Sequence, residues 1–121
     1  MSQRHDPLEI TPSLLLRAYA SGVFPMSDGA GSEDIYWIDP KTRGIIPLDG
    51  LHVSRSMRKL MRRGGFEVHV DRDFRGTVED CAAREETWIN DEITELYVTL
   101  YRLGYAHSVE VWEGDARVGG L

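Results

Sequence analysis

The stretch that decides the fold is NDEITELYVTLYRLGYAHSVEVWEGDARVGGL, residues 90–121. Asn90 is a helix-capping residue and Gly104 is a helix stop, so a helix is predicted between them. Residues 106–112 alternate with the period of a strand, residues 113–115 supply a turn, and residues 116–121 begin a return strand. A helix followed by a hairpin indicates an α+β fold. The apolar positions that predict the buried face of this helix are Ile93, Leu96, Tyr97, Leu100 and Leu103.

Shorter elements are predicted before residue 90, because capping residues and glycine or proline breakers divide the chain at close intervals. Residues 24–25 read as an extended turn, and residues 27–34 as a polar loop. The predicted elements are a helix at 12–21, a hairpin of two strands at 35–38 and 44–48, a helix at 55–63, a strand at 66–70, and a helix from Asp71 or Asp73 to about Ala83.

The composition of the chain limits its class. With 121 residues and 41% hydrophobic content it can form one compact domain, with at most a small appendage. A net charge of -6 gives no global signal of nucleic-acid binding, so any such site must be local. A single cysteine excludes a disulfide framework and a cysteine-based zinc site. The N-terminus lacks the apolar run of a signal peptide, and no membrane span is expected, so we predict a cytoplasmic protein.

The predicted helix at 55–63 has an unusual distribution of charge. At roughly 100° per residue, its cations fall within an arc of about 140°, with Met57, Leu60 and Met61 on the other side. The chain has a net charge of -6, so the remaining residues carry -11 once these five positive charges are subtracted. A stripe of this kind attracts a polyanion such as RNA, although a solvated helix face is the competing interpretation. The cationic residues are Arg55, Arg58, Lys59, Arg62 and Arg63.

Two further residues are candidates for a nucleotide pocket. Trp88 stands just before the capping Asn90, where an indole ring can stack on a nucleobase, although a core position is the commoner role. Met26 follows Phe24-Pro25 and can line an apolar pocket. Trp37 and Trp112 fall at strand positions and are expected in the core.

The strand at 106–112 has polar side chains on both faces, which is unusual for a core strand and suggests that it lines a cleft. His107 is a candidate acid or base near neutral pH, and Glu110 is a candidate for binding an amine. The spacing identifies no partner for either residue. The sequence contains no phosphate-binding glycine motif, no Gly-x-Ser-x-Gly elbow and no histidine pair at metal spacing, so no metal site is predicted.

Several of these segments, taken in order, resemble the leucyl/phenylalanyl-tRNA-protein transferase family from Leu14 to Leu121. The combination is specific because so many short matches occur with the correct spacing. The matching segments are LLRAY at 15–19, GVFP at 22–25, YWIDP at 36–40, RGIIP at 43–47, LHVSRSMRK at 51–59, TWI at 87–89, AHSVEVW at 106–112 and VGG at 118–120.

This resemblance implies a small N-terminal domain, here residues 1–42, joined to a domain with the acetyltransferase-like (GNAT-like) fold, here residues 43–121. It implies transfer of leucine or phenylalanine from aminoacyl-tRNA to proteins that begin with Arg or Lys, which marks those proteins for degradation. No acetyl-CoA or other cofactor is expected. A CoA-dependent acetyltransferase and a noncatalytic RNA-binding module are the two rival interpretations.

The resemblance also assigns roles by position. The cationic face of residues 55–63 resembles the surface that holds the tRNA acceptor stem, and Trp88 resembles the aromatic residue that contacts the terminal adenosine. Met26 stands where some relatives have a second tryptophan. The family's catalytic groups are expected beyond Leu121, where the return strand ends abruptly. We therefore expect 121 residues alone to be inactive and prone to self-association.

Overall fold

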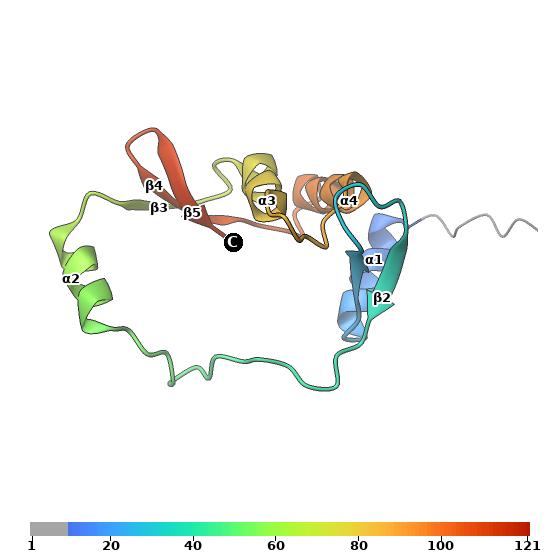
Figure 1. The fold of residues 1–121 in the computed structure, drawn as a ribbon, viewed down its shortest axis with the longest axis horizontal. Coiled ribbons are helices and arrows are strands. Elements are labelled where there is room, and N and C mark those ends of the chain that lie inside the picture. The colour runs from blue at the N-terminus through green and yellow to red at the C-terminus, as the bar shows by residue number, and fades with distance from the viewer. Residues whose placement is uncertain (1–9) are drawn as a thin grey trace, which may run out of the picture. The chain divides into compact units, whose positions relative to one another are not determined.

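The computed structural model describes residues 10–121, which form two compact units. Unit 1 takes in the described residues as far as Asp39 together with Ala82–Ala106, and unit 2 takes in Pro40–Cys81 and His107–Leu121. The fold is α+β, as the sequence predicts, with four helices and two small antiparallel sheets in the described part of the chain (Figure 1).

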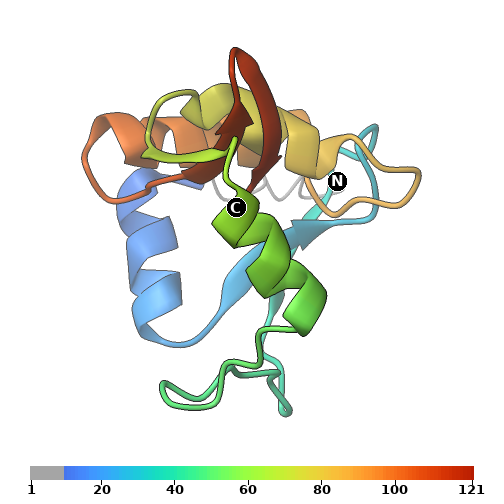
Figure 2. The same ribbon diagram turned by 90° about the vertical axis from the view of Figure 1, so that its left-hand side faces the viewer.

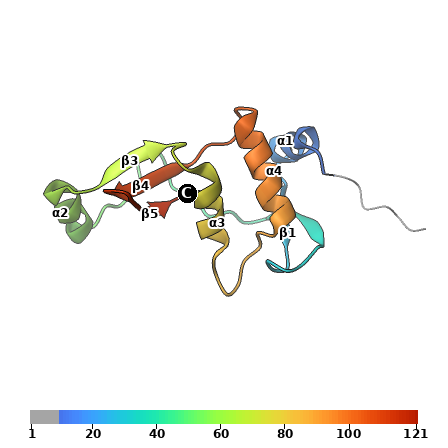
Figure 3. The ribbon, with the colours of Figure 1, turned by 90° about the horizontal axis from the view of Figure 1, so that it is seen from above.

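Unit 1 consists of two helices and a hairpin. Helix α1 (Pro12–Ala20) begins at Thr11, whose side chain accepts a hydrogen bond of 3.1 Å from the Leu14 amide, as expected for an N-cap. Helix α4 (Asp91–Arg102) lies beside α1 (Figure 3). The core between these helices contains Leu15, Leu96 and Leu100, with Ile10, Leu16, Tyr97 and Ala106 packed around it.

The hairpin of unit 1 pairs strand β1 (Phe24–Ser27) with strand β2 (Ile35–Ile38). The prediction of an extended turn at Phe24-Pro25 was therefore wrong. Pro25 pairs with Trp37, and the strand tolerates a proline because β1 has one neighbour only among the described residues. Trp37 is 38% exposed, so its predicted core position was also wrong.

Unit 2 contains a three-stranded antiparallel sheet in the order β3-β4-β5. Its strands are β3 (Glu67–Val70), β4 (Val109–Glu113) and β5 (Ala116–Gly120). Helix α3 (Phe74–Ala82) covers one face of the sheet at Gly120, where an added Cβ would lie 3.0 Å from the Cγ2 atom of Thr77. Helix α2 (Arg55–Arg63) also belongs to this unit.

Two other strand predictions need correction. Residues 44–48 form no strand, and Pro47 instead accepts a turn hydrogen bond of 3.0 Å from the Gly50 amide. Strand β4 begins at Val109 rather than at residue 106, because the Ser108 amide donates to the side chain of Asp71 at 2.9 Å instead of joining the sheet. Leu103, predicted in the core, is 57% exposed just beyond the end of α4. Within residues 10–121, no helix has the length and hydropathy that a membrane span requires.

Candidate nucleic-acid interface

Local sequence sets both ends of α2. The Ser54 hydroxyl accepts a hydrogen bond of 3.2 Å from the Met57 amide, as an N-cap does. At the other end, Gly64 has a φ of 74°, which a residue with a side chain rarely adopts. The helix is therefore independent of tertiary packing for its start and stop. It follows a stretch, residues 40–54, that has no helix or strand (Figure 2).

The cationic face of α2 is open to solvent. No residue of the helix is buried, and none of its five cations is paired with a carboxylate among residues 10–121. The apolar side is open as well, with Met57 49% and Met61 67% exposed. A cluster of exposed and unpaired positive charges in a chain of net charge -6 favours binding of a polyanion. The five residues are Arg55, Arg58, Lys59, Arg62 and Arg63.

Trp88 is held against strand β1 through its backbone. Its carbonyl oxygen accepts hydrogen bonds from the Ser27 amide at 2.9 Å and from the Ser27 hydroxyl at 3.0 Å. Ile89 and Asn90, which follow Trp88, are buried, whereas Trp88 itself is 40% exposed. The structure thus fixes the backbone of Trp88 and leaves much of its side chain accessible, as base stacking requires.

Met26 lies in the same strand as Ser27 and is half-buried. Its strand neighbour Ser27 makes both hydrogen bonds to Trp88, so the structure brings together the two segments that carry the predicted adenosine pocket. These segments are 61 residues apart in the chain. The contact lies entirely within unit 1, whereas the cationic helix belongs to unit 2.

A cavity of about 500 Å³ also lies within unit 1. It is lined by residues 30–33 of the hairpin loop and by residues 90–92 at the start of α4. The Asn90 side-chain amide donates to the Ser32 carbonyl at 2.9 Å and joins the two walls. Glu33, Asp91 and Glu92 make the lining acidic, so it suits a cationic group better than a phosphate. The sequence did not reveal this cavity, because residues far apart in the chain form it.

His107 forms a hydrogen bond with Asp71 in unit 2. The His107 Nδ1 atom lies 2.7 Å from the Asp71 carboxylate, and the His107 side chain is 58% exposed. This hydrogen bond, together with one from the Ser108 amide, lowers the pKa of Asp71. Asp71 has a φ of 60°, which is unfavourable for most residues but tolerated by aspartate. His107 therefore presents an accessible imidazole edge whose orientation Asp71 fixes.

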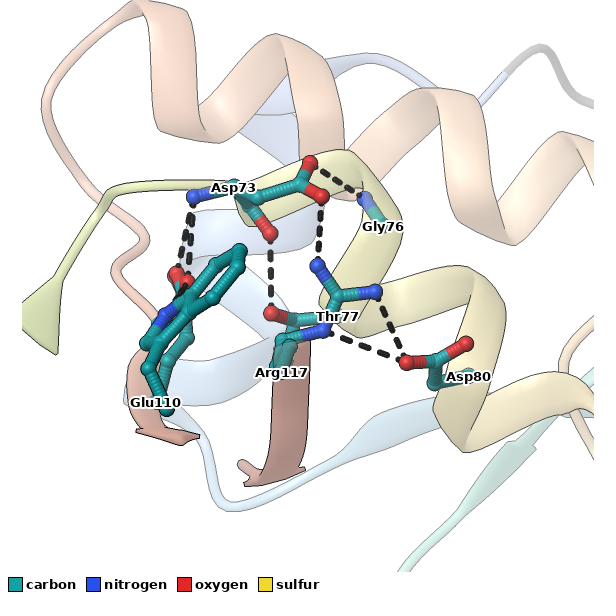
Figure 4. Close-up of polar contacts among 8 residues, drawn as sticks. Asp73, Gly76, Thr77, Asp80, Glu110 and Arg117 are labelled. Carbon is teal, nitrogen blue, oxygen red and sulfur yellow. Dashed lines mark hydrogen bonds and ion pairs between the residues drawn. The ribbon is translucent and has the colours of Figure 1, made fainter. Parts of the chain in front are cut away.

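Glu110 lies on the face of the sheet that α3 covers and is fully buried. Its carboxylate accepts hydrogen bonds from the Asp73 amide at 3.0 and 3.1 Å (Figure 4). It also accepts hydrogen bonds from the Ser108 hydroxyl at 2.6 Å and from the Trp112 indole at 3.0 Å. Burial alone raises the pKa of a carboxyl group, but these hydrogen bonds, led by that of Ser108, outweigh it and lower the pKa of Glu110. Glu110 thus stays ionised at neutral pH and joins β4 to Asp73, the residue just before α3.

Arg117 of β5 joins the sheet to α3 a second time. Its guanidinium group pairs with Asp73 and with Asp80, the latter at 2.7 Å (Figure 4). Arg72 stacks over the ring of Trp112, with 4.0 Å between its guanidinium carbon and the ring centroid. Sequence reasoning missed this network because no short motif links the residues. Within residues 10–121, no group of three or more His, Cys, Asp or Glu side chains is placed to hold a metal ion.

The fold and the site define a class of protein: an α+β chain with a solvent-exposed cationic helix and a tryptophan anchored beside a hairpin strand. Comparison with known families identifies it further. The family model described as "Leucyl/phenylalanyl-tRNA protein transferase" matches residues 45–121. The family model for the N-terminal domain of the same family matches residues 9–41. The chain belongs to the leucyl/phenylalanyl-tRNA protein transferase family.

Individual relatives agree with this assignment. A leucyl/phenylalanyl-tRNA–protein transferase of Cereibacter sphaeroides (strain ATCC 17029 / ATH 2.4.9) is 57% identical over 95% of this chain and 54% of its own length. The enzyme of the same name from Jannaschia sp. (strain CCS1) is 48% identical over 93% of this chain and 53% of its own length. The enzyme of the same name from Roseobacter denitrificans is 52% identical over 94% of this chain and 54% of its own length. The chain spans about half the length of these curated relatives.

Proposed function

We propose that this chain supplies the tRNA-binding part of an aminoacyltransferase that moves leucine or phenylalanine from aminoacyl-tRNA to proteins beginning with Arg or Lys. Membership of the family carries the proposal, because the relatives are named leucyl/phenylalanyl-tRNA–protein transferases. The unpaired cations of α2 support it, since they give an acidic chain a local surface for phosphates. The role in protein degradation and the cytoplasmic location are part of this proposal.

In the proposed reaction, the α-amine of the acceptor attacks the ester carbonyl that joins the amino acid to the terminal adenosine. A peptide bond forms, the ester bond breaks, the amine loses a proton and the ribose oxygen gains one. Placing amine and ester within reacting distance can supply roughly 7 to 11 kcal/mol of the barrier. We assign this chain to holding the tRNA, and we assign the groups that position the amine to the half of the relatives that lies outside the match.

Within this chain we assign separate tasks to the two units. The cationic face of α2 binds the acceptor-stem backbone, which fixes the register of the RNA without reading its sequence. Trp88 stacks on the terminal adenosine, and Met26 borders the same pocket from β1. Two observations support this assignment. Trp88 is exposed, and its carbonyl oxygen accepts two hydrogen bonds from Ser27, which fix its backbone.

We also propose that residues 1–42 form an N-terminal domain and that residues 43–121 begin a GNAT-like domain. The two family models, which end at residue 41 and begin at residue 45, support a boundary there. The antiparallel order β3-β4-β5 with α3 on one face is compatible with a larger mixed sheet. His107, which is exposed and oriented by Asp71, remains a candidate for lining the cleft.

The proposal is tested with a hybrid in which residues 1–121 are joined to the unmatched half of the Cereibacter sphaeroides relative. We expect the hybrid to transfer radiolabelled leucine from leucyl-tRNA to a peptide that begins with Arg, and not to the same peptide with an acetylated N-terminus. A folded hybrid that binds leucyl-tRNA but labels neither peptide would contradict the proposal.

The rival function is a noncatalytic RNA-binding module, which the exposed cationic helix alone would also support. The two functions differ in their dependence on the aminoacyl group. A transferase binds leucyl-tRNA in preference to deacylated tRNA, whereas a module that contacts only the phosphate backbone binds both equally. Competition between the two RNAs for the hybrid distinguishes these functions.

A further inference from the structure

The two faces of the β1-β2 hairpin in unit 1 differ in burial. Register pairs Met26 with Tyr36, and because side chains alternate along a strand these two residues share one face of the hairpin. Ser27, next to Met26 in β1, points to the opposite face and is 2% exposed. Met26 is only half-buried. The face of Met26 and Tyr36 is therefore the more open side of β1.

The segment that carries Trp88 lies along the edge of β1 away from β2. The Ser27 amide donates to the Trp88 carbonyl oxygen at 2.9 Å, and β2 pairs with β1 on the other edge. Strand β1 thus runs between Trp88 and β2. Ile89, the residue after Trp88, is 7% exposed, whereas Trp88 is 40% exposed. This alternation of exposure favours the open side of β1 for the Trp88 ring.

The spacing of the three segments suits one nucleobase. Neighbouring hydrogen-bonded segments lie about 4.7 to 4.9 Å apart, so the backbones at Trp88 and Tyr36, on either side of β1, are separated by roughly 10 Å. A base held between two rings needs roughly 7 Å, twice the spacing of about 3.4 Å between stacked bases. Rings that lean toward each other over β1 close this difference, and Met26 lies between them.

Tyr36 offers a ring that is both accessible and restrained. It is 39% exposed, almost as much as Trp88. Its hydroxyl forms a hydrogen bond with the side chain of Asp28, which follows β1. Partial burial, and then Asp28, raise the pKa of Tyr36, so the phenol keeps its proton at neutral pH. A ring that is already restrained loses less side-chain entropy when a ligand binds.

We propose that Tyr36 is a second base-stacking residue of this chain, and that the terminal adenosine of the tRNA lies between the rings of Tyr36 and Trp88 with Met26 beneath it. The thioether of Met26 is polarizable but has no aromatic face, so the second ring comes from the neighbouring strand. Tyr36 extends the pocket that the proposed function assigns to Trp88, and the proposal rests on that function.

The test compares the affinity of the 121-residue protein for two RNAs, an acceptor stem that ends in CCA and the same stem without its terminal adenosine. Tyr36→Ala should weaken binding of the complete RNA at least fivefold, the equivalent of about 1 kcal/mol of stacking, and leave binding of the shortened RNA unchanged. Tyr36→Phe, which keeps the ring, should change both affinities less than threefold. Fluorescence anisotropy measures each affinity.

Two further variants sharpen the test. Met26→Trp added to Tyr36→Ala should restore most of the lost affinity, because it returns a ring to the same face of the hairpin. Trp37→Ala is the matched control, since Trp37 is 38% exposed and lies on the opposite face of β2, and it should change the affinity less than twofold. If circular dichroism shows that Tyr36→Ala is unfolded, Tyr36→Leu takes its place, because leucine is apolar and has no ring.

Several outcomes overturn the proposal. If Trp88→Ala and removal of the adenosine each weaken binding while Tyr36→Ala does not, Trp88 stacks alone and the proposed function stands without Tyr36. Equal weakening of both RNAs by Tyr36→Ala, or an equal loss in Trp37→Ala, would show that Tyr36 supports the hairpin rather than the base. If removing the terminal adenosine leaves the affinity of the unaltered protein unchanged, the adenosine pocket of the proposed function fails as well.

Discussion

The carbonyl oxygen of Trp88 accepts two hydrogen bonds from Ser27, one from its amide at 2.9 Å and one from its hydroxyl at 3.0 Å. Ser27 is 2% exposed, so this double contact is shielded from water. Backbone anchoring of this kind fixes a loop residue without using its side chain. The side chain of Trp88, which is 40% exposed, is therefore available for a ligand.

Trp88→Ala should weaken binding of an acceptor-stem RNA that ends in CCA by about 5-fold to 150-fold, because stacking of one base contributes roughly 1 to 3 kcal/mol. Affinity for the same RNA without its terminal adenosine should not change. Trp37→Ala is the matched control, since Trp37 is 38% exposed and Trp88 is 40% exposed. Fluorescence anisotropy measures each affinity. Equal losses in the two variants, or no loss in Trp88→Ala, would exclude a stacking role.

Glu110→Gln should destabilise the fold by about 2 to 4 kcal/mol, because the carboxylate accepts hydrogen bonds from three donors at a fully buried position. The amide nitrogen of the glutamine would place its own hydrogens against the donor groups that surround Glu110. Urea unfolding followed by circular dichroism gives the free energy. Glu113→Gln, on the exposed end of β4, should change it by less than about 0.5 kcal/mol. Comparable effects of the two substitutions would show that the Glu110 network contributes little.

The contribution of Glu110 should depend on pH. Its pKa is lower in the folded protein than its ordinary value, so its stabilising effect is present above the unfolded pKa of about 4.3 and is lost as the pH falls through the folded pKa. The difference in unfolding free energy between the protein and Glu110→Gln should therefore be constant from pH 7 to about pH 5.5 and shrink below about pH 4. A difference in unfolding free energy that grows as the pH falls would be a change of the opposite sign and would rule out this role of Glu110.

Asp71→Ala should lower the melting temperature of the protein, since it removes the acceptor for His107 and Ser108 and leaves alanine at a φ of 60°. Asp71→Asn should lower the melting temperature less than Asp71→Ala does, because asparagine tolerates this conformation and keeps one acceptor oxygen. Thermal unfolding of both variants measures the ranking. The interpretation fails if alanine and asparagine cost the same.

Local signals in the sequence predicted most of the helices correctly. Thr11, Ser54 and Asn90 were identified as N-caps, and each accepts the expected hydrogen bond from an amide three residues on. The hairpin turn at 113–115 and its return strand were also confirmed. These elements depend on residues close in the chain, which is why sequence reasoning found them.

The errors came from long-range pairing. Phe24–Ser27 becomes a strand because Ile35–Ile38 pairs with it, and residues 44–48 remain irregular although their composition favours a strand. The start of β4 moves to Val109 because Asp71, far away in the chain, binds the Ser108 amide. The same limit applies to the site. The sequence singled out Trp88 and Met26, but not the contact with Ser27 that links their segments.

We propose that the cationic face of α2 binds the tRNA backbone, and the salt dependence of tRNA binding tests this proposal most directly. The measurement is the affinity for leucyl-tRNA from 50 to 200 mM salt, for the protein and for a variant with Arg55, Lys59 and Arg62 changed to Gln. A control variant carries the same change at Arg17, Arg84 and Arg102, which are also exposed. Removing one cation that binds a phosphate should reduce the slope of log affinity against log salt by about 1, so we predict a slope smaller by about 3 in the α2 variant and unchanged in the control. An unchanged slope and affinity in a folded α2 variant would contradict the account.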